Sequence, residues 1–186
     1  MTIDPGVEIG WAMWATRHGD NGKPKQFKRV SPPLAAGECI PYRSKGVRRL
    51  NAGTDRGAND YVLRAMGAVD LLRESIDAIG YEPVLFLVEW PRFFGGSFGQ
   101  GVAERGDLVK LSFSVGLIAG LATEYEASFQ VIGVNTWKGQ LPKSVVESRV
   151  TYIIGGKGWV QRLGLRPGSH AFDAIGIGCH LRGIKF

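Results

Sequence analysis

The sequence contains little cysteine and no long apolar run. Its two cysteines, Cys39 and Cys179, are far apart and form no metal-ligand spacing, which excludes a disulfide scaffold and a cysteine-based zinc site. No apolar stretch is as long as a membrane span, and the N-terminus has no basic segment ahead of an apolar one. No internal repeat is present either. We therefore expect a reduced, cytoplasmic protein with no membrane partner.

Glycine and positive charge are abundant. The 27 glycines are scattered without a period, so they indicate tight turns and close backbone packing rather than a linker or a fibre. The net charge of +6 and the pI of about 9.5 favour a polyanion such as nucleic acid as partner, although many basic proteins bind none. At 186 residues, with 44% hydrophobic and 22% charged side chains, the chain fits one globular domain over residues 1–186.

Apolar patterning predicts an opening hairpin followed by alternating helices and strands. Pro5 and Gly6 form the turn of that hairpin. Ser169 is a suitable N-cap for the last helix. We expect strands within 2–15 and at 26–31, 84–88 and 129–134, and helices at 59–79, 102–124, 144–154 and 170–181. This order predicts an α/β fold with a mixed central β-sheet flanked by helices.

Three segments are expected to lack regular structure. Residues 31–57, which include Arg48 and Arg49, form either a solvated loop or a segment that contacts phosphates. Residues 90–101 are rich in glycine and aromatic side chains, and residues 135–143 are predicted to form a polar loop.

Four titratable side chains lie at the ends of predicted elements. Asp4 ends the first strand and Glu89 ends the central one, while His170 and Asp173 share one face of the first turn of the last helix. Parallel neighbouring strands that end in acids bring them to one rim of a sheet, where a crossing helix can add the other two. Such hard ligands suit Mg²⁺ or Mn²⁺. Carboxylates gathered without a metal would raise each other's pKa.

Each of these residues also has a simpler interpretation. Asp4 could belong to an ordinary Asp-Pro-Gly turn, and Glu89 could be a solvated strand end. Asp173 could merely favour the helix dipole, and His170 could be an exposed first-turn residue. Their joint occurrence at the ends of predicted elements favours a shared site.

Five short motifs follow one another along the chain: IDPG (3–6, with Gly10 after it), FLVEWP (86–91), DLVKLSFSVGLIAGLA (107–122), NTWKGQLPKSVVESRV (135–150) and SHAFDAIGIGCHL (169–181). In this order, over most of the chain, they resemble the RuvC-type Holliday-junction resolvases of the RNase H-like superfamily. Part of that family has a histidine at the position of His170. Two segments depart from the family pattern: the loop at 138–143 is shorter, and the insertion at 32–57 is longer and more basic. These departures suggest a phage-encoded or otherwise divergent member of the family.

The resemblance implies a metal-dependent endonuclease that resolves Holliday junctions by symmetric phosphodiester hydrolysis. It implies two Mg²⁺ per active site, replaceable by Mn²⁺ and about 4 Å apart, and no small-molecule cofactor. Asp4 would bridge the two metals, Glu89 and Asp173 would complete their ligands, and His170 would ligate one metal or assist proton transfer.

The resemblance also implies contacts with branched DNA. Lys143 would stabilise charge on the scissile phosphate, and Lys138 would position the DNA backbone. Phe93 or Phe94 would stack on bases at the branch point. The residues expected to bind DNA are Lys138, Lys143, Arg92, Phe93, Phe94, Arg48 and Arg49.

Symmetric cleavage of two strands implies a two-fold homodimer. Gly116 and Gly120 lie one turn apart in the helix predicted at 102–124, and they allow another backbone to approach closely. That backbone is either the sheet of the same subunit or a second copy of the chain.

Three rival functions remain open at this point. The first is an RNase H-like nuclease for broader branched-DNA or RNA–DNA hybrid substrates. The second is a junction-binding protein without catalysis, which the intact set of acids disfavours. The third is a sugar-kinase or actin-like ATPase, for whose two domains 186 residues are too few.

Overall fold

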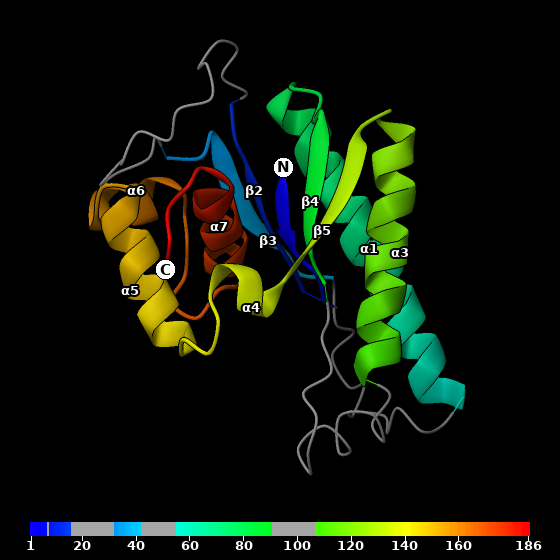
Figure 1. Cartoon of the computed structure of the whole chain (residues 1–186). Helices are drawn as coiled ribbons and strands as arrows, with labels where there is room; N and C mark the ends of the chain where they lie inside the picture. The colour runs from blue at the N-terminus through cyan, green and yellow to red at the C-terminus, as the bar shows by residue number, and fades with distance from the viewer. Residues whose placement is uncertain (7, 16–31, 42–54, 91–106) are drawn as a thin grey trace.

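The computed structural model describes residues 1–6, 8–15, 32–41, 55–90 and 107–186. Within these residues, five strands form one sheet: β1 (Thr2–Asp4), β2 (Ile9–Met13), β3 (Ala35–Cys39), β4 (Leu85–Trp90) and β5 (Ser128–Gly133). Their order is β3-β2-β1-β4-β5, as Figure 1 shows. β1 runs antiparallel to β2 and parallel to β4, and β4 runs parallel to β5. The sheet is therefore mixed, as the sequence predicts.

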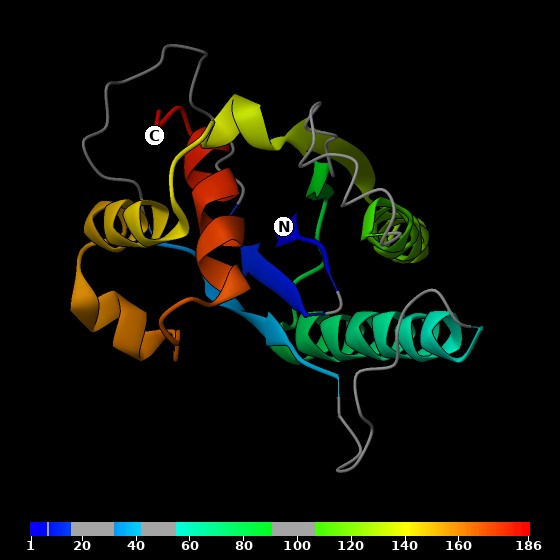
Figure 2. The same ribbon diagram turned by 90° about the horizontal axis from the view of Figure 1, so that it is seen from below.

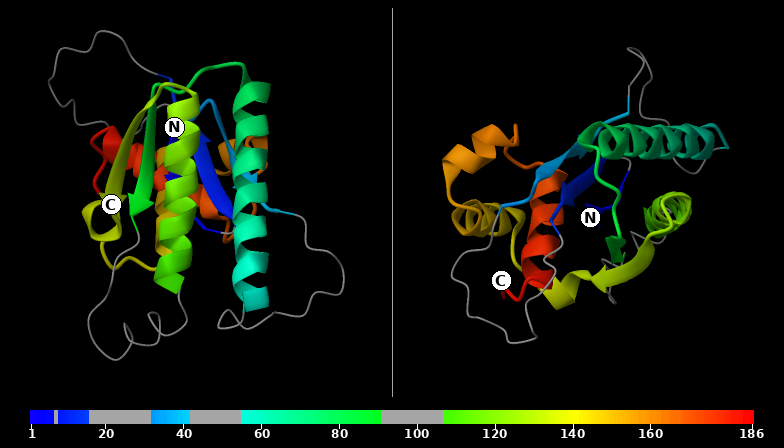
Figure 3. Two further views of the ribbon diagram at one scale, coloured as in Figure 1. Left: turned by 90° about the vertical axis from the view of Figure 1, so that its right-hand side faces the viewer. Right: turned by 90° about the horizontal axis from the view of Figure 1, so that it is seen from above.

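Helices cover both faces of this sheet (Figures 2 and 3). One face carries α1 (Asp55–Ile79) and α3 (Asp107–Glu124), which pack against each other. The other carries α7 (His170–Leu181), with α4 (Val134–Trp137), α5 (Lys143–Ile153) and α6 (Lys157–Arg162) around it. The predicted α/β architecture is confirmed.

Side chains along β1 and β4 alternate between the two faces of the sheet, and each face has its own hydrophobic core. Ile3 and Val88 belong to the core beneath α1 and α3, whereas Leu87 belongs to the core beneath α7. Because successive side chains point to opposite faces of a sheet, Asp4 and Glu89 share the α7 face of the sheet with Leu87.

The whole of α7 from Ala171 to Cys179 is buried, and two kinds of contact fix its position. The Thr2 hydroxyl donates a hydrogen bond of 2.8 Å to the carbonyl oxygen of Ala174. Gly176 and Gly178 lie against indole rings: a Cβ at either position would be 2.5 Å from Trp137 or 2.2 Å from Trp14. Glycine at these two places lets α7 lie close to its neighbours.

The structure corrects several predicted element boundaries. The third strand is Ala35–Cys39, inside a segment predicted to be irregular, and the strand predicted at 26–31 lies outside the described residues. The predicted 135–143 loop overlaps the short helix α4 and the first residue of α5, and α6 was not predicted. β3 forms because all five of its residues pair with β2, although alanine and glycine have little strand propensity of their own.

Of the two neighbours considered for Gly116 and Gly120, the structure excludes the sheet of the same subunit. The apolar stripe of α3, which includes Val115 and Ile118, faces the core. Gly116 and Gly120 lie on the exposed side of α3, where a Cβ added to either glycine would meet nothing in the described chain within 4 Å. Among the described residues, no helix is long and apolar enough to cross a membrane.

Candidate active site

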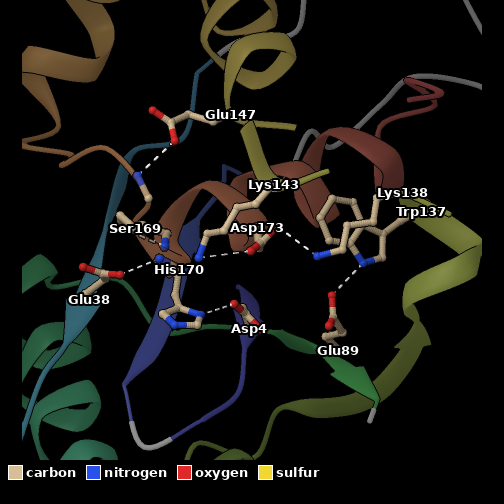
Figure 4. A network of polar contacts seen from close by, with 12 residues as sticks. Asp4, Glu38, Glu89, Trp137, Lys138, Lys143, Glu147, Ser169, His170 and Asp173 are labelled. Carbon is tan, nitrogen blue, oxygen red and sulfur yellow. Dashed lines mark hydrogen bonds and ion pairs between the residues drawn. The ribbon is translucent and has the colours of Figure 1, made fainter. Parts of the chain in front are cut away.

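Two carboxylates lie side by side where β1 and β4 end. Ile3 pairs with Val88 in parallel register, so the next residues, Asp4 and Glu89, occupy the same rim of the sheet. Asp4 is 8% exposed, and Glu89 is partly buried. Figure 4 shows Asp4 beside His170 and Glu89 beneath Trp137.

The first turn of α7 brings two further groups to this rim. Ser169 caps the helix, its hydroxyl accepting the backbone N–H of Ala171 at 3.1 Å. His170 and Asp173, three residues apart, then project toward β1. Ligand atoms of Asp4, His170 and Asp173 all lie within 4.8 Å of one another.

Asp4 and His170 form a direct pair. Nδ1 of His170 lies 2.7 Å from Oδ2 of Asp4, and this hydrogen bond raises the pKa of His170. Burial is the main cause that raises the pKa of Asp4, and the charge of Asp173 adds to it. When Nδ1–H donates to ionised Asp4, a neutral ring keeps its lone pair on Nε2, where it can bind a metal or accept a proton.

Glu89 is held from the other side by Trp137. The indole Nε1–H donates to Oε2 of Glu89 at 2.8 Å. Burial, reinforced by the charge of Asp4, nevertheless raises the pKa of Glu89 to about 7. The ionised form of Glu89 therefore lacks a full set of compensating partners among the described side chains.

Two lysines converge on Asp173. Nζ of Lys138 lies 3.1 Å from Oδ1, and Nζ of Lys143 lies 3.7 Å from Oδ2. Asp173 is 4% exposed, so both ammonium groups reach inward to a buried carboxylate, Lys138 from the C-cap of α4 and Lys143 from the first residue of α5. The two sequence-predicted lysines thus belong to the same cluster as the acids.

The donor set fits a divalent cation. It combines two buried carboxylates and an imidazole within one ion's reach, with Glu89 on the adjacent strand, and hard oxygen donors of this kind suit Mg²⁺ or Mn²⁺. Burial opposes ionisation of Asp4 and Glu89, and a bound cation would offset that opposition. The cluster could therefore hold a metal ion.

No family model matches the chain, and no curated protein matches its sequence. A structure of T. thermophilus RuvC in complex with a Holliday junction substrate matches 95% of this chain and 87% of its own, with a TM-score of 0.52 and 19% identity. The fold is RuvC-like. A further Thermus thermophilus RuvC structure aligns over 95% of this chain with 17% identity and a TM-score of 0.48.

The remaining predicted site residues lie outside the part of the chain that the structure describes. These are Arg92, Phe93, Phe94, Arg48 and Arg49.

The sequence does not reveal two residues that lie next to this rim of the sheet. Trp137 precedes Lys138, yet only its position in space reveals the bond to Glu89. Glu38, in β3, accepts the backbone N–H of His170. An acid within a short strand carries no local signal of this contact.

Proposed function

We propose that the protein is a metal-dependent endodeoxyribonuclease that resolves Holliday junctions by symmetric phosphodiester hydrolysis. One observation carries the proposal: ligand atoms of Asp4, His170 and Asp173 gather within 4.8 Å at the rim of a RuvC-like sheet. The RuvC structure of the same fold is in complex with a Holliday junction substrate, which favours branched DNA as the substrate here.

Asp4, Glu89, His170 and Asp173 would hold Mg²⁺, two ions per active site, with Mn²⁺ as a substitute. Bound there, the metal would activate water and stabilise the leaving oxygen of the cleaved phosphodiester. The protein's own part is to keep these ligands ordered and partly dehydrated. His170, oriented by Asp4 through Nδ1, can hold or pass a proton at Nε2.

The two lysines would interact with the substrate as well as with Asp173. The Lys143 side chain is 40% exposed and that of Lys138 is 18% exposed. Lys143 is therefore the better placed to reach a scissile phosphate beside the acids, and Lys138 the better placed to keep Asp173 oriented. Lys138 also lies over the Trp137 ring, 4.7 Å from its centroid, which favours a fixed position for this ammonium group.

Charge along the chain supports a polyanion on the α7 side. Residues 134–186, all of them described, contain two acids, Glu147 and Asp173. The basic residues of this segment are Lys138, Lys143, Arg149, Lys157, Arg162, Arg166, Arg182 and Lys185. A strong excess of positive charge around the acids would attract DNA phosphates toward the site.

The exposed face of α3 is our candidate for a two-fold dimer contact. Val109 is 73% exposed and Phe113 is 36% exposed, and both lie on the same side of α3 as Gly116 and Gly120. An apolar, glycine-lined helix face suits close packing against a second copy, which symmetric cleavage requires.

Cleavage of a synthetic four-way junction in Mg²⁺ tests the proposal. Wild type should give paired, symmetric nicks, and Asp173→Asn should abolish them while still binding the junction in EDTA, because binding depends on phosphate contacts. Duplex DNA and an RNA–DNA hybrid are tested in parallel, which distinguishes a junction resolvase from the RNase H-like alternative. Binding without cleavage by the wild type would instead favour the non-catalytic alternative, and wild-type rates in Asp173→Asn would contradict the assigned site.

A further inference from the structure

A single row of residues across β1, β2 and β3 lies beneath the first turn of α7. Asp4 pairs with Gly10, and Gly10 pairs with Glu38. Cross-strand partners project to the same face of a sheet, so the three positions form one line on the α7 face.

Each member of the row makes a different contact with His170, and Figure 4 shows those of Asp4 and Glu38. Asp4 bonds to Nδ1 of the ring at 2.7 Å. Gly10 lies beneath the carbonyl group: a Cβ there would be 2.2 Å from the carbonyl oxygen. Glu38 accepts the backbone N–H through Oε1. The side chain, the carbonyl group and the amide of His170 are thus all positioned by one row.

Glu38 is itself fixed from two sides. Its side chain is 11% exposed, and Oε2 lies 3.2 Å from Nη2 of Arg166, in the segment that leads into α7. The N–H of the first helical residue has no partner within the helix, and a carboxylate at a helix N-terminus is favoured by the dipole. A charge-assisted hydrogen bond of this kind is stronger than one between neutral groups.

We propose that Glu38 is a positioning residue for the metal site. By holding the amide of His170 on β3, it sets how closely His170 and Asp173 approach Asp4, and thereby sets the affinity of the cluster for a divalent cation. The inference rests on the proposed function only in taking the cluster to bind metal. Outer partners that orient metal ligands commonly change affinity by roughly 10–100-fold.

Three substitutions separate the hydrogen bond from charge and bulk. Glu38→Gln keeps an acceptor oxygen at the same reach but removes the charge. Glu38→Asp keeps the charge but withdraws the acceptor by one methylene, and Glu38→Ala removes both. Glu147→Ala is the matched control, because Glu147 accepts the backbone N–H of Gly168 at 2.9 Å, two residues before His170.

Isothermal titration with Mn²⁺ on the full chain, with circular dichroism to check folding, is the test. We expect Glu38→Asp and Glu38→Ala to lose about 10-fold in Mn²⁺ affinity. Glu38→Gln should lose less, because it keeps a neutral acceptor in place of a charged one, and Glu147→Ala should stay close to wild type. The ring resonances of His170 should shift in Glu38→Asp and Glu38→Ala, and not in Glu147→Ala.

Three results would overturn the inference. The first is that a folded Glu38→Asp or Glu38→Ala variant binds Mn²⁺ as tightly as the wild type does. The second is that Glu38→Gln binds Mn²⁺ as weakly as Glu38→Asp, and the third is that the wild type binds no measurable Mn²⁺. The second would mean that Glu38 acts by its charge alone and not by the reach of its hydrogen bond. Junction cleavage is scored separately, so a protein that binds Mn²⁺ in the expected order but cuts no junction contradicts the proposed function alone.

Discussion

Without metal, the protein should lose stability as the pH rises from about 4.5 to above 7, because of Glu89. Burial, with the charge of Asp4, raises the pKa of Glu89 from 4.5 to about 7. The folded state then binds a proton that the unfolded state has already released. Since stability falls with pH wherever the folded state binds more protons, the loss begins near pH 4.5 and is complete above pH 7.

The size of the effect follows from that shift. Each unit of pKa difference corresponds to about 1.4 kcal/mol, so ionising Glu89 in the folded protein costs about 3 kcal/mol at pH 8. For a chain of this length, such a change lowers the midpoint of thermal unfolding by roughly 6–12 °C. Glu89→Gln cannot ionise, and its unfolding midpoint should lack this part of the pH dependence.

Calorimetry in EDTA between pH 4 and 8.5 measures the difference. Glu89→Gln should match wild type near pH 4 and exceed it at pH 8, whereas Glu82→Gln, at an exposed position just before β4, should follow wild type throughout. Saturating Mg²⁺ should flatten the wild-type curve, because a cation favours the ionised carboxylate. Parallel curves for wild type and Glu89→Gln would refute the assigned burial of this acid.

Two further substitutions test neighbouring parts of the site and the dimer. Trp137→Phe removes the hydrogen-bond donor to Glu89, so it should raise the pKa of Glu89 further. The free energy of unfolding should fall by about 1.5–3 kcal/mol at pH 8 and by less at pH 5. Equal losses at the two pH values in denaturant titrations would contradict this. A Cβ at Gly116 would meet nothing within 4 Å in the described chain, so Gly116→Leu should leave the fold of the subunit intact by circular dichroism. It should convert the proposed dimer to a monomer in light scattering and lower junction cleavage. A wild type that is already monomeric would exclude this interface.

The sequence predicts best the elements whose signals are local. Ser169 and the apolar run after it define α7 correctly as His170–Leu181, because an N-cap acts on the adjacent turn. The strand that carries Glu89 is a continuous apolar run, and the structure places it at Leu85–Trp90. β3, in contrast, contains alanine, glycine and glutamate and becomes a strand through backbone pairing with β2, which no local pattern reveals.

The same division applies to the candidate site. Asp4 and Glu89 could be predicted as neighbours because both lie at the ends of parallel strands, and His170 and Asp173 because helix spacing puts them on one face. Glu38 could not, since its partner is a backbone amide 132 residues away. Nor could the pairing of both lysines with Asp173, because a sequence shows acids and bases without showing which of them meet.

The charges that meet at the rim explain why an imidazole suits position 170. Three carboxylates already lie close together at this rim, those of Asp4, Glu89 and Asp173. Burial is the largest cause that raises the pKa of Glu89, and the charges of Asp4 and Asp173 raise it further. A carboxylate at position 170, 2.7 Å from Asp4 in place of Nδ1, would add a fourth like charge, which raises the penalty for ionising all of them. Imidazole instead donates to Asp4 and still offers a nitrogen ligand. Both lysines form ion pairs with Asp173, whereas Glu89 has the neutral donor of Trp137 as its hydrogen-bond partner, and the charge of Lys138 lowers the pKa of Glu89 by less than burial and Asp4 raise it. The place where positive charge is most lacking is therefore the rim between Asp4 and Glu89, which is where a divalent cation would contribute most.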